Sequence, residues 1–235
     1  FKWQGRIDNE DGLEGLRWHQ KVDEHAYKES GNLTSVNNSD KRATIDNTVT
    51  LVGFESDLGV AFNKGRTGAA AGPNAIRQAL SNLPWHWPNT SFTDLGNVTA
   101  VDNLAQAQTQ YADAISYALK QHTGFTIGLG GGHEIAWGSY QGLFNTKPEN
   151  ARIGIINFDA HFDLRKPVLN TSSGTPFRQV YDHCQLHNTP FYYACLGVSK
   201  AANTAALFNF ANVSNTRYLT DMALNDESLC MQRID

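Results

Sequence analysis

The sequence predicts an α/β fold of three layers, in which helices cover both faces of a mainly parallel central sheet. From residue 49 onward, short apolar segments alternate with longer segments rich in helix-forming residues. The apolar segments contain few polar residues, as is typical of parallel strands that are buried on both faces. No internal repeat or low-complexity linker interrupts this pattern, so we expect a single domain spanning 1–235.

Residues 1–46 differ from the rest of the chain because they are polar and irregular. By composition, "SGNLTSVNNSDKR" is their least structured part. We expect 1–46 to form an N-terminal extension of the domain, part of it mobile.

Five segments after this extension have the composition of strands. They are "TVTLVGF" (48–54), "SFTDLGNV" (91–98), "GFTIGLGG" (124–131), "ARIGIINFD" (151–159) and "FYYACLGVS" (191–199). The segment 151–159 is predicted to be the most clearly buried of them, and 91–98 to be a short edge strand.

Helices are predicted between these strands, at 71–83, 103–122, about 133–144 and 203–211, and a further helix is expected to begin at Pro176. Pro73 suits the first turn of its helix, where a missing N–H costs nothing. The helix 103–122 has an apolar stripe on one face, formed by Leu104, Ala107, Tyr111, Ala114, Ile115 and Ala118.

Charge and composition argue against several classes of protein. The formal net charge of −4 is the opposite of the basic surface that a nucleic-acid-binding protein needs. No apolar segment approaches the length of a membrane-spanning helix, and the N-terminus lacks the apolar core of a signal peptide. The three cysteines are far apart and form no CxxC pair. We therefore expect a protein of the reducing cytoplasm that binds neither nucleic acid nor membrane.

The segment "FDAHFD" (158–163) closes a predicted strand and carries three polar side chains at alternate positions. In an extended chain, Asp159, His161 and Asp163 point to the same side. Buried carboxylates need compensation, and two carboxylates with an imidazole suit a divalent cation such as Mn²⁺ or Zn²⁺. The alternative is a helix-capping turn with a packed histidine.

The segment "GLGGGHE" (128–134) also closes a predicted strand. It lacks the G-x-G-x-x-G spacing of a dinucleotide-binding turn, since His133 and Ile135 stand where the last glycine would be. The glycines instead allow the backbone to crowd a site into which His133 points.

These two motifs are expected to meet, because the carboxyl ends of neighbouring parallel strands lie at the same edge of a sheet. The four candidate ligands are His133, Asp159, His161 and Asp163. They are enough to hold one metal ion, or part of a two-metal site that activates a hydroxide.

Two other features are interpreted without a catalytic role. His183 and His187 have helical spacing but no accompanying carboxylates, which favours surface histidines. The segment "PWHWP" (84–88) is interpreted as a packed turn.

In their order, the motifs resemble the ureohydrolase family, which includes arginase, agmatinase and formimidoylglutamase. The resemblance extends over roughly 49–200 and includes "GRTGAAAGPNAIRQAL" (65–80) and "SSGTPFR" (172–178) besides the two metal motifs. Within the family the chain is most similar to formimidoylglutamase, because of "GGGHE", "SSGTPF" and the N-terminal "WQGRID" and "RWHQ".

The resemblance implies an arginase-like fold and a homo-oligomeric, metal-dependent hydrolase of C–N bonds in linear amidines. It implies two Mn²⁺ ions per subunit, with Asp159 bridging both, His133 and Asp163 on the first and His161 on the second. The bridging hydroxide would attack N-formimidoyl-L-glutamate and release L-glutamate and formamide, a step of histidine degradation. In this sense Asp159 and His161 are the catalytic residues that the resemblance implies.

Three positions depart from the pattern of many relatives. Gly132 and Glu134 stand where "G-G-D-H-S" has an aspartate and a serine. Ser173 stands where arginase- and agmatinase-like members have a histidine thought to pass protons to the leaving amine. Because serine is a poor general acid at neutral pH, this difference favours another substrate.

The family also carries a later motif, S-x-D-x-D-x-x-D-P, which adds two aspartates to the metals. This motif does not occur before Asp235. We therefore expect the C-terminal part of the fold, with these ligands and the last strands, to be missing from this chain, unless the chain is an inactive fragment.

A substrate derived from glutamate needs partners for its carboxylates. The predicted partners are Arg165, just after the metal motif, and Arg178, after "GTPF", with Ser173 nearby. For each arginine, a surface ion pair is the alternative. Two other functions stay open: an agmatinase or other guanidino-hydrolase that releases urea, and a non-catalytic, metal-poor member of the family.

Overall fold

The structure is a computed structural model, and it describes residues 1–26, 34–35, 48–99, 102–121 and 124–225. Its strands form two sheets, one with the order β2-β1-β4-β3-β5 and one with the order β6-β7-β8. The strands are β1 (Val22–Ala26), β2 (Thr34–Ser35), β3 (Thr48–Glu55), β4 (Ser91–Thr99), β5 (Thr126–Leu129), β6 (Gly154–Phe158), β7 (Tyr192–Val198) and β8 (Arg217–Thr220). All neighbouring strands are parallel except β1 and β2, which are antiparallel.

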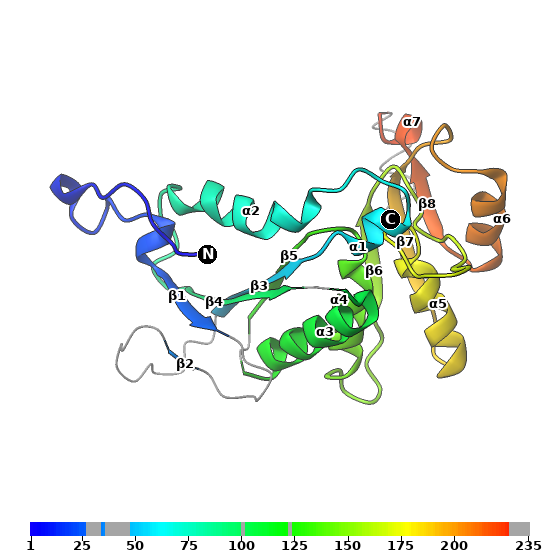
Figure 1. Cartoon of the computed structure of the whole chain (residues 1–235), viewed down its shortest axis with the longest axis horizontal. Coiled ribbons are helices and arrows are strands. Elements are labelled where there is room, and N and C mark those ends of the chain that lie inside the picture. Colours follow the sequence, from blue (N-terminus) through cyan, green and yellow to red (C-terminus); the bar gives the residue numbers. More distant parts are fainter. Residues whose placement is uncertain (27–33, 36–47, 100–101, 122–123, 226–235) are drawn as a thin grey trace.

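Helices cover the first sheet on both of its faces, which gives the predicted three layers. In Figure 1, α2 lies on one face of this sheet, and α3, with α4 packed against it, lies on the other. The α-helices are α1 (Leu58–Phe62), α2 (Gly72–Ser81), α3 (Leu104–Gln121), α4 (Ile135–Phe144), α5 (Pro176–Leu186), α6 (Ala205–Val213) and α7 (Asp221–Leu224). Three short 3-10 helices are η1 (Asn9–Asp11), η2 (Trp18–Gln20) and η3 (Ala69–Ala71). None of the described helices is long and apolar enough to cross a bilayer.

The segments predicted as strands and helices form those elements, with bounds that differ by a few residues. The apolar stripe of α3 is buried along its whole length, and its largest side chain, Tyr111, packs against Phe54 of β3. Burial of one large apolar side chain stabilises a fold by about 1.5–3 kcal/mol, so the three large side chains of the stripe contribute strongly to the docking of α3. Pro73 lies in the first turn of α2, as predicted.

The prediction that 91–98 is an edge strand is wrong. β4 lies inside the first sheet, between β1 and β3, and pairs with both. Its second neighbour, β1, comes from the segment that was expected to be irregular, so that expectation is also wrong for residues 22–26. Trp3 and Trp18 from the same segment are buried against Phe92 of β4 in one apolar cluster. Most of the polar stretch 30–42 lies outside the described residues.

The prediction of a packed turn at 84–88 holds for Trp85, which is half-buried, whereas Trp87 is 43% exposed. The Trp85 ring meets the rings of Trp18 and Phe92 edge to face, at centroid distances of 5.8 and 5.1 Å. The turn therefore closes the end of the apolar cluster around β4.

The prediction that 151–159 is the most deeply buried strand is also wrong. β6 pairs only with β7 within the described part of the chain, and Ile156 and Phe158 are 68% and 80% exposed. Likewise β5 pairs only with β3, and its Ile127 is 43% exposed. The physical reason is that the apolar composition of a segment predicts a strand but does not specify its neighbours. Burial depends on which strands and helices of other parts of the chain pack against it.

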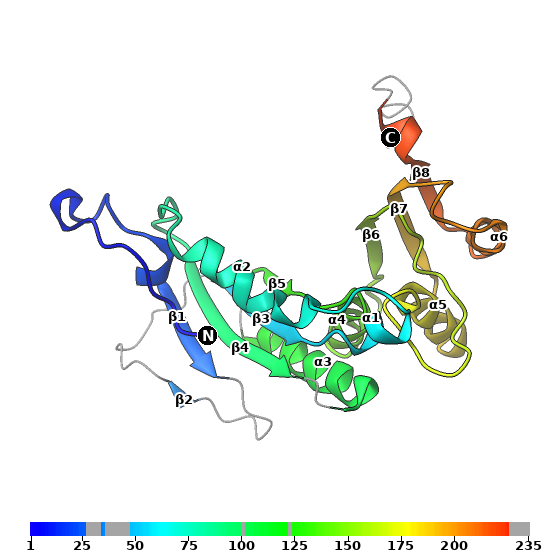
Figure 2. The ribbon, with the colours of Figure 1, turned by 45° about the horizontal axis from the view of Figure 1, so that its top comes forward.

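The second sheet lies beyond α1 and α4, turned relative to the first, as both ribbon views show (Figures 1 and 2). Its own apolar cluster is formed by Phe162, Leu164, Phe177, Tyr193, Cys195, Val198, Leu207 and Ala211. These residues come from β7, α5, α6 and the loop after β6, so each sheet has a separate core.

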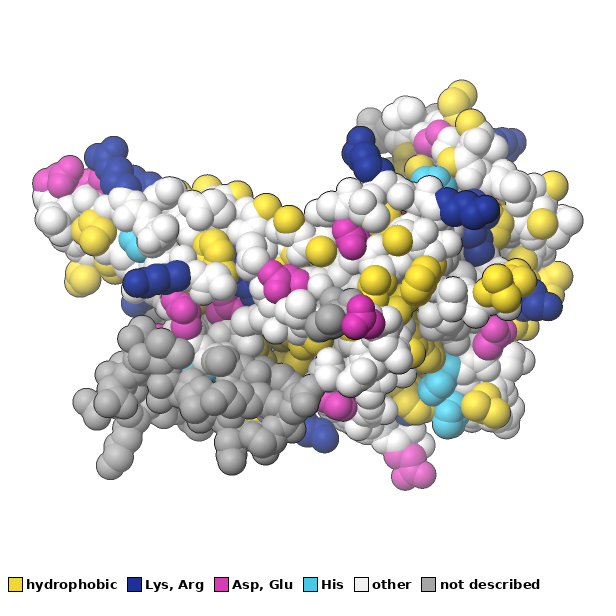
Figure 3. Space-filling model, in the orientation of Figure 1, with side chains coloured by type: hydrophobic (Ala, Val, Ile, Leu, Met, Phe, Trp, Pro, Cys, Tyr) yellow, Lys and Arg dark blue, Asp and Glu magenta, His cyan; other side chains and the backbone are white. Residues whose placement is uncertain are grey.

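Charged side chains are dispersed over the face of the molecule that Figure 3 shows. Basic and acidic groups lie among each other there rather than in one continuous stripe. This distribution agrees with the small negative net charge of the sequence.

Candidate metal centre

The end of β5 places His133 through backbone hydrogen bonds to the end of β3. The Gly131 N–H donates to the Phe54 carbonyl at 3.1 Å, and the Gly132 N–H donates to the Ser56 carbonyl at 2.8 Å. These two bonds carry the chain past the last paired residue of β5 and into α4. His133 is therefore held at the carboxyl end of the first sheet, as predicted.

The end of β6 places the second motif, but not by continuing an extended strand. The His161 N–H donates to Asp159 Oδ1 at 2.9 Å, and Asp163 has a left-handed φ of 48°. The prediction that alternate residues of an extended chain point the same way is therefore wrong here. The chain turns because the Asp159 carboxylate captures an amide two residues later, which is a common turn-forming contact of aspartate.

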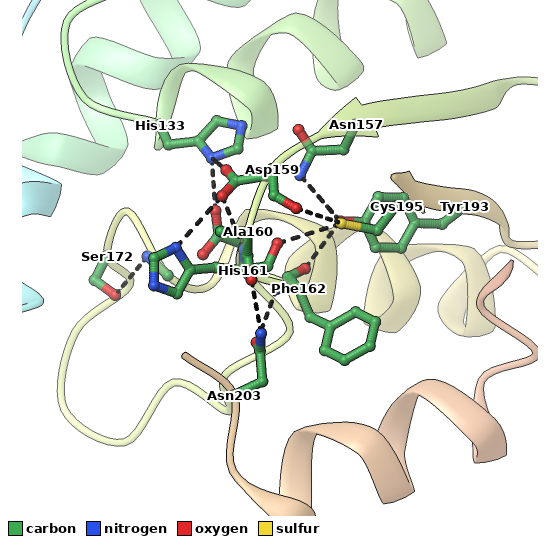
Figure 4. Close-up of polar contacts among 12 residues, drawn as sticks. His133, Asn157, Asp159, Ala160, His161, Phe162, Ser172, Tyr193, Cys195 and Asn203 are labelled. Carbon is green, nitrogen blue, oxygen red and sulfur yellow. Dashed lines mark hydrogen bonds and ion pairs between the residues drawn. The ribbon is translucent and has the colours of Figure 1, made fainter. Parts of the chain in front are cut away.

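Side chains from β7 and from the loop that follows it anchor this turn. Tyr193 donates its hydroxyl hydrogen to the Phe162 carbonyl at 2.9 Å, and Asn203 Nδ2 donates to the Ala160 carbonyl at 2.8 Å. Cys195 Sγ lies 3.3 Å from the His161 carbonyl (Figure 4). Sequence reasoning missed these anchors, although Tyr193 and Cys195 have the i, i+2 spacing of residues on one side of a strand.

Burial keeps the anchoring groups in their neutral forms. It raises the pKa of the Cys195 thiol to about 11, so this cysteine is a hydrogen-bonding thiol rather than a thiolate ligand. Burial also raises the pKa of the Tyr193 hydroxyl far above its usual value. Both residues therefore hold the turn without adding charge to it.

The two strand ends meet at His133. Its Nδ1 lies 2.6 Å from Asp163 Oδ2 and 3.2 Å from Asp159 Oδ2 (Figure 4 shows the contact with Asp159). Potential ligand atoms of these three residues all lie within 4.8 Å of one another. Among the described residues, no other group of three or more His, Cys, Asp or Glu side chains has its ligand atoms within this distance of one another.

The prediction that the two motifs share an edge of one sheet is wrong, although their side chains meet. β5 belongs to the first sheet and β6 to the second, and the two strands are not paired. The contact is made instead by the turn after β6, which carries Asp159 and Asp163 across to His133. The two motifs therefore meet through their side chains and not through pairing of β5 with β6.

The charges of the cluster control its protonation. Burial alone would lower the pKa of His133, but the hydrogen bonds and charges of Asp159 and Asp163 outweigh burial and raise it to about 10. Burial would raise the pKa of Asp159, but its bonds to His133 and to the His161 amide lower it to about 2. The free cluster therefore holds a protonated His133 imidazole beside an ionised Asp159 carboxylate.

His161 lies at the margin of the cluster. Its Nδ1 is 3.4 Å from Asp159 Oδ1, and its side chain is 54% exposed, against 33% for that of His133. His161 is not among the three residues whose ligand atoms converge. It points toward Asp159 from the side away from His133 (Figure 4).

The structure brings together two of the three predicted substrate-binding residues. The Arg165 N–H donates to the Gly174 carbonyl at 3.0 Å, so the residue after Ser173 lies directly against Arg165. The Arg165 side chain is exposed. Arg178 instead pairs with Asp182 at 3.1 Å and stacks over the ring of Phe210, 3.9 Å from its centroid.

The donor set fits a divalent cation of the Mn²⁺ type. Two carboxylates face a single imidazole, so a bound dication would balance the negative charges once it displaced the imidazole proton. The ring centroids of His183 and His187 lie 4.2 Å apart, and the His183 ring also packs against Phe144 at a centroid distance of 4.6 Å, so His183 is half-buried and His187 is exposed.

Comparisons with known proteins give relatives for this chain. A family model described as the arginase family matches residues 47–235. Formimidoylglutamase of Aeromonas salmonicida is 45% identical over 97% of the chain, and that of Vibrio cholerae is 46% identical over 97%. The chain covers 68% and 66% of these relatives, so it spans about two thirds of their length.

A solved structure shares the fold. A crystal structure of Trypanosoma cruzi formiminoglutamase with Mn²⁺ superposes with a TM-score of 0.66 and 22% identity. The match covers 77% of this chain and 62% of that one. At this level of identity, the likeness supports the α/β architecture with its parallel strands and flanking helices.

Proposed function

Since this chain belongs to the arginase family, we propose that the protein hydrolyses N-formimidoyl-L-glutamate to L-glutamate and formamide with the help of two manganese ions. Water is the second reactant, and the bond that breaks is the C–N bond between the formimidoyl carbon and the glutamate nitrogen. The observation that carries the proposal is the 45% identity to a formimidoylglutamase over nearly the whole chain.

The metal part of the proposal is supported by the convergence of His133, Asp159 and Asp163. These residues would hold one ion, and Asp159 would be shared with a second ion beside His161. The chemistry that paired manganese ions supply when bound is the activation of water at neutral pH. The residues of this chain contribute the negative charge that attracts the ions and a turn whose anchors fix the position of Asp159.

Substrate binding is proposed for the surface next to this cluster. Arg165 directly follows the metal-binding turn, and its exposed guanidinium is free to form a bidentate contact with a substrate carboxylate. Ser173 lies beside it in the loop before α5 and can donate a hydrogen bond. Arg178 would bind the substrate only if the substrate displaced its ion pair with Asp182.

The proposal extends to the state of the protein in the cell. Cys184 and Cys195 are free and buried, which suits a reducing cytoplasm. A homo-oligomer is also part of the proposal, and the molar mass in solution, measured by light scattering, tests it.

The deciding experiment compares products. The complete gene product, loaded with Mn²⁺, is incubated with formimidoylglutamate, agmatine or arginine, and formamide and urea are measured. We expect formamide from formimidoylglutamate and no urea from the other two. Release of urea would identify a guanidino-hydrolase, and metal uptake without any turnover would favour a non-catalytic member of the family.

A further inference from the structure

Glu134, which directly follows His133, has an unusual position for a charged residue. Its side chain is completely buried and lies beneath the turn that connects β5 to α4. Carboxylates are rarely buried without a partner, because removal from water disfavours the charge. The described residues provide no basic side chain as a hydrogen-bond or ion-pair partner for this carboxyl group.

The carboxyl group of Glu134 has one specific contact. Its Oε1 accepts a hydrogen bond from the Gly59 N–H at 2.8 Å, and its Oε2 is buried without a partner among the described residues. Gly59 lies in α1, which is far from β5 in sequence. Glu134 therefore links the metal-bearing turn to α1.

The neighbouring glycines make room for this contact. A Cβ on Gly59 would lie 2.5 Å from Glu134 Cδ, and a Cβ on Gly132 would collide with Glu134 Oε2. The glutamate and the glycine before the histidine in "GGGHE" thus depend on each other. This accounts for both departures from "G-G-D-H-S" by a single packing arrangement.

The backbone of Gly59 also contacts the predicted substrate-binding loop. The Gly59 carbonyl, besides accepting the helical N–H of Asn63, accepts the Ser173 N–H at 3.0 Å. One residue later, a Cβ on Gly174 would lie 2.9 Å from Arg165 Cδ and 3.1 Å from Asn63 Oδ1. The loop is therefore packed against α1 on one side and Arg165 on the other.

From these contacts we infer that Glu134 is a positioning residue that fixes the loop around Ser173 relative to the metal-binding residue His133. The path runs from the Glu134 carboxyl group to the Gly59 N–H, across the Gly59 Cα to the Gly59 carbonyl, and from there to the Ser173 amide. The link itself is a matter of geometry, whereas its role in substrate binding rests on the proposed function.

The arrangement also predicts which replacement can substitute for Glu134. Glu134→Gln keeps the length of the side chain and an oxygen that can accept from Gly59. Glu134→Ala removes the acceptor, and Glu134→Asp withdraws it by one methylene. The buried hydrogen bond from Ser116 Oγ to the Gly142 carbonyl lies near the opposite end of α4, so Ser116→Ala is a matched control.

Amide hydrogen exchange at single-residue resolution tests the link without any substrate. In Glu134→Ala, the amides of Gly59 and Ser173 should exchange about tenfold faster or more, since the acceptor of a buried hydrogen bond is lost. Glu134→Gln and Ser116→Ala should leave both amides protected as in the wild type. If Glu134→Ala does not fold, Glu134→Asp makes the same test.

Kinetics then test the role of the link in substrate binding. Glu134→Ala should raise KM for formimidoylglutamate about tenfold, while Glu134→Gln restores it and the manganese content stays unchanged. Unchanged Ser173 exchange in a folded Glu134→Ala or Glu134→Asp protein would overturn the inference. So would loss of manganese without a change in KM. A wild type that does not turn over formimidoylglutamate would refute the proposed function alone, because the exchange result is independent of it.

Discussion

The Arg77–Asp94 pair of the first sheet and the His133–Asp159–Asp163 cluster between the sheets both place charge below the surface, but their surroundings differ. Arg77 and Asp94 are 0% and 5% exposed, and two guanidinium nitrogens bind the two carboxylate oxygens at 2.7 Å each. Asp94 also accepts hydrogen bonds from Trp3 Nε1 at 2.7 Å and from the Gly96 amide at 3.0 Å. Every charge in this pair has a protein partner.

The cluster around His133 instead has more acidic groups than basic ones. Two carboxylates share one imidazole, and the side chains of Asp159 and His133 are 24% and 33% exposed. The comparison teaches that a saturated buried pair belongs to the framework, whereas an exposed cluster with surplus negative charge is available to a cation. Substitutions in the two sites should therefore have different effects on metal binding and on stability.

Removing a carboxylate from the open cluster should abolish function without unfolding the protein. Asp159→Ala should eliminate both manganese retention and turnover, an effect larger than the roughly 10–100-fold loss caused by residues behind a ligand. Metal analysis and formamide release measure the two effects, and Asp113→Ala, an exposed position on α3, is the control. Full manganese retention in Asp159→Ala would remove Asp159 from the centre.

Removing one partner of the closed pair should have the reverse result. Arg77→Met leaves Asp94 buried and unpaired, which should lower the free energy of unfolding by about 3–5 kcal/mol. The urea midpoint measures this change, and the double variant Arg77→Met, Asp94→Asn should recover part of it. The folded fraction should still bind manganese. If Arg77→Met were as stable as the wild type but had lost manganese, the Arg77–Asp94 pair would serve metal binding and not stability, contrary to our expectation.

Proton competition should make the open cluster sensitive to pH. His133 has a pKa of about 10 in the free cluster, so a metal ion must displace its proton at any lower pH. Affinity for Mn²⁺ should therefore rise with pH, by about tenfold per unit for one released proton. Asp159, with a pKa of about 2, is already ionised and adds nothing to the slope. Calorimetry in buffers of different ionisation enthalpy counts the protons, and a count of zero between pH 6 and 8 would contradict the assignment.

The smallest expected effect concerns the substrate-binding surface. Arg165→Ala should raise KM for formimidoylglutamate about tenfold, because one charge-assisted contact is lost. Arg178→Ala, which breaks an ion pair within α5, should change KM less. Steady-state kinetics of both variants test the difference. An unchanged KM in Arg165→Ala would remove Arg165 from the binding site.

Local features of the fold could be predicted from the sequence because they depend on neighbouring residues. The apolar stripe of α3 and the position of Pro73 in α2 follow from helical periodicity and the geometry of proline. The placement of ligands after β5 and β6 follows from a general property of parallel strands. These rules require no knowledge of which strands are neighbours.

Long-range features could not be predicted in this way. Nothing in the composition of residues 22–26 indicates that they pair with β4, and the apolar run of β6 does not specify its partners. The same limit applies to the anchors Tyr193 and Asn203, which contact the metal-binding turn although they lie more than 30 residues further along the chain. Glu134 was noticed as a departure from the family pattern, but its role depends on Gly59, which is distant in sequence.

The central claim is that His133, Asp159 and Asp163 form a manganese site rather than a structural hydrogen-bond cluster. Anomalous diffraction at the manganese edge from crystals of the Mn²⁺-loaded protein tests it most directly. We predict an anomalous peak in contact with all three side chains. A map in which the His133 ring still bonds to both carboxylates, with manganese elsewhere or absent, would contradict the claim.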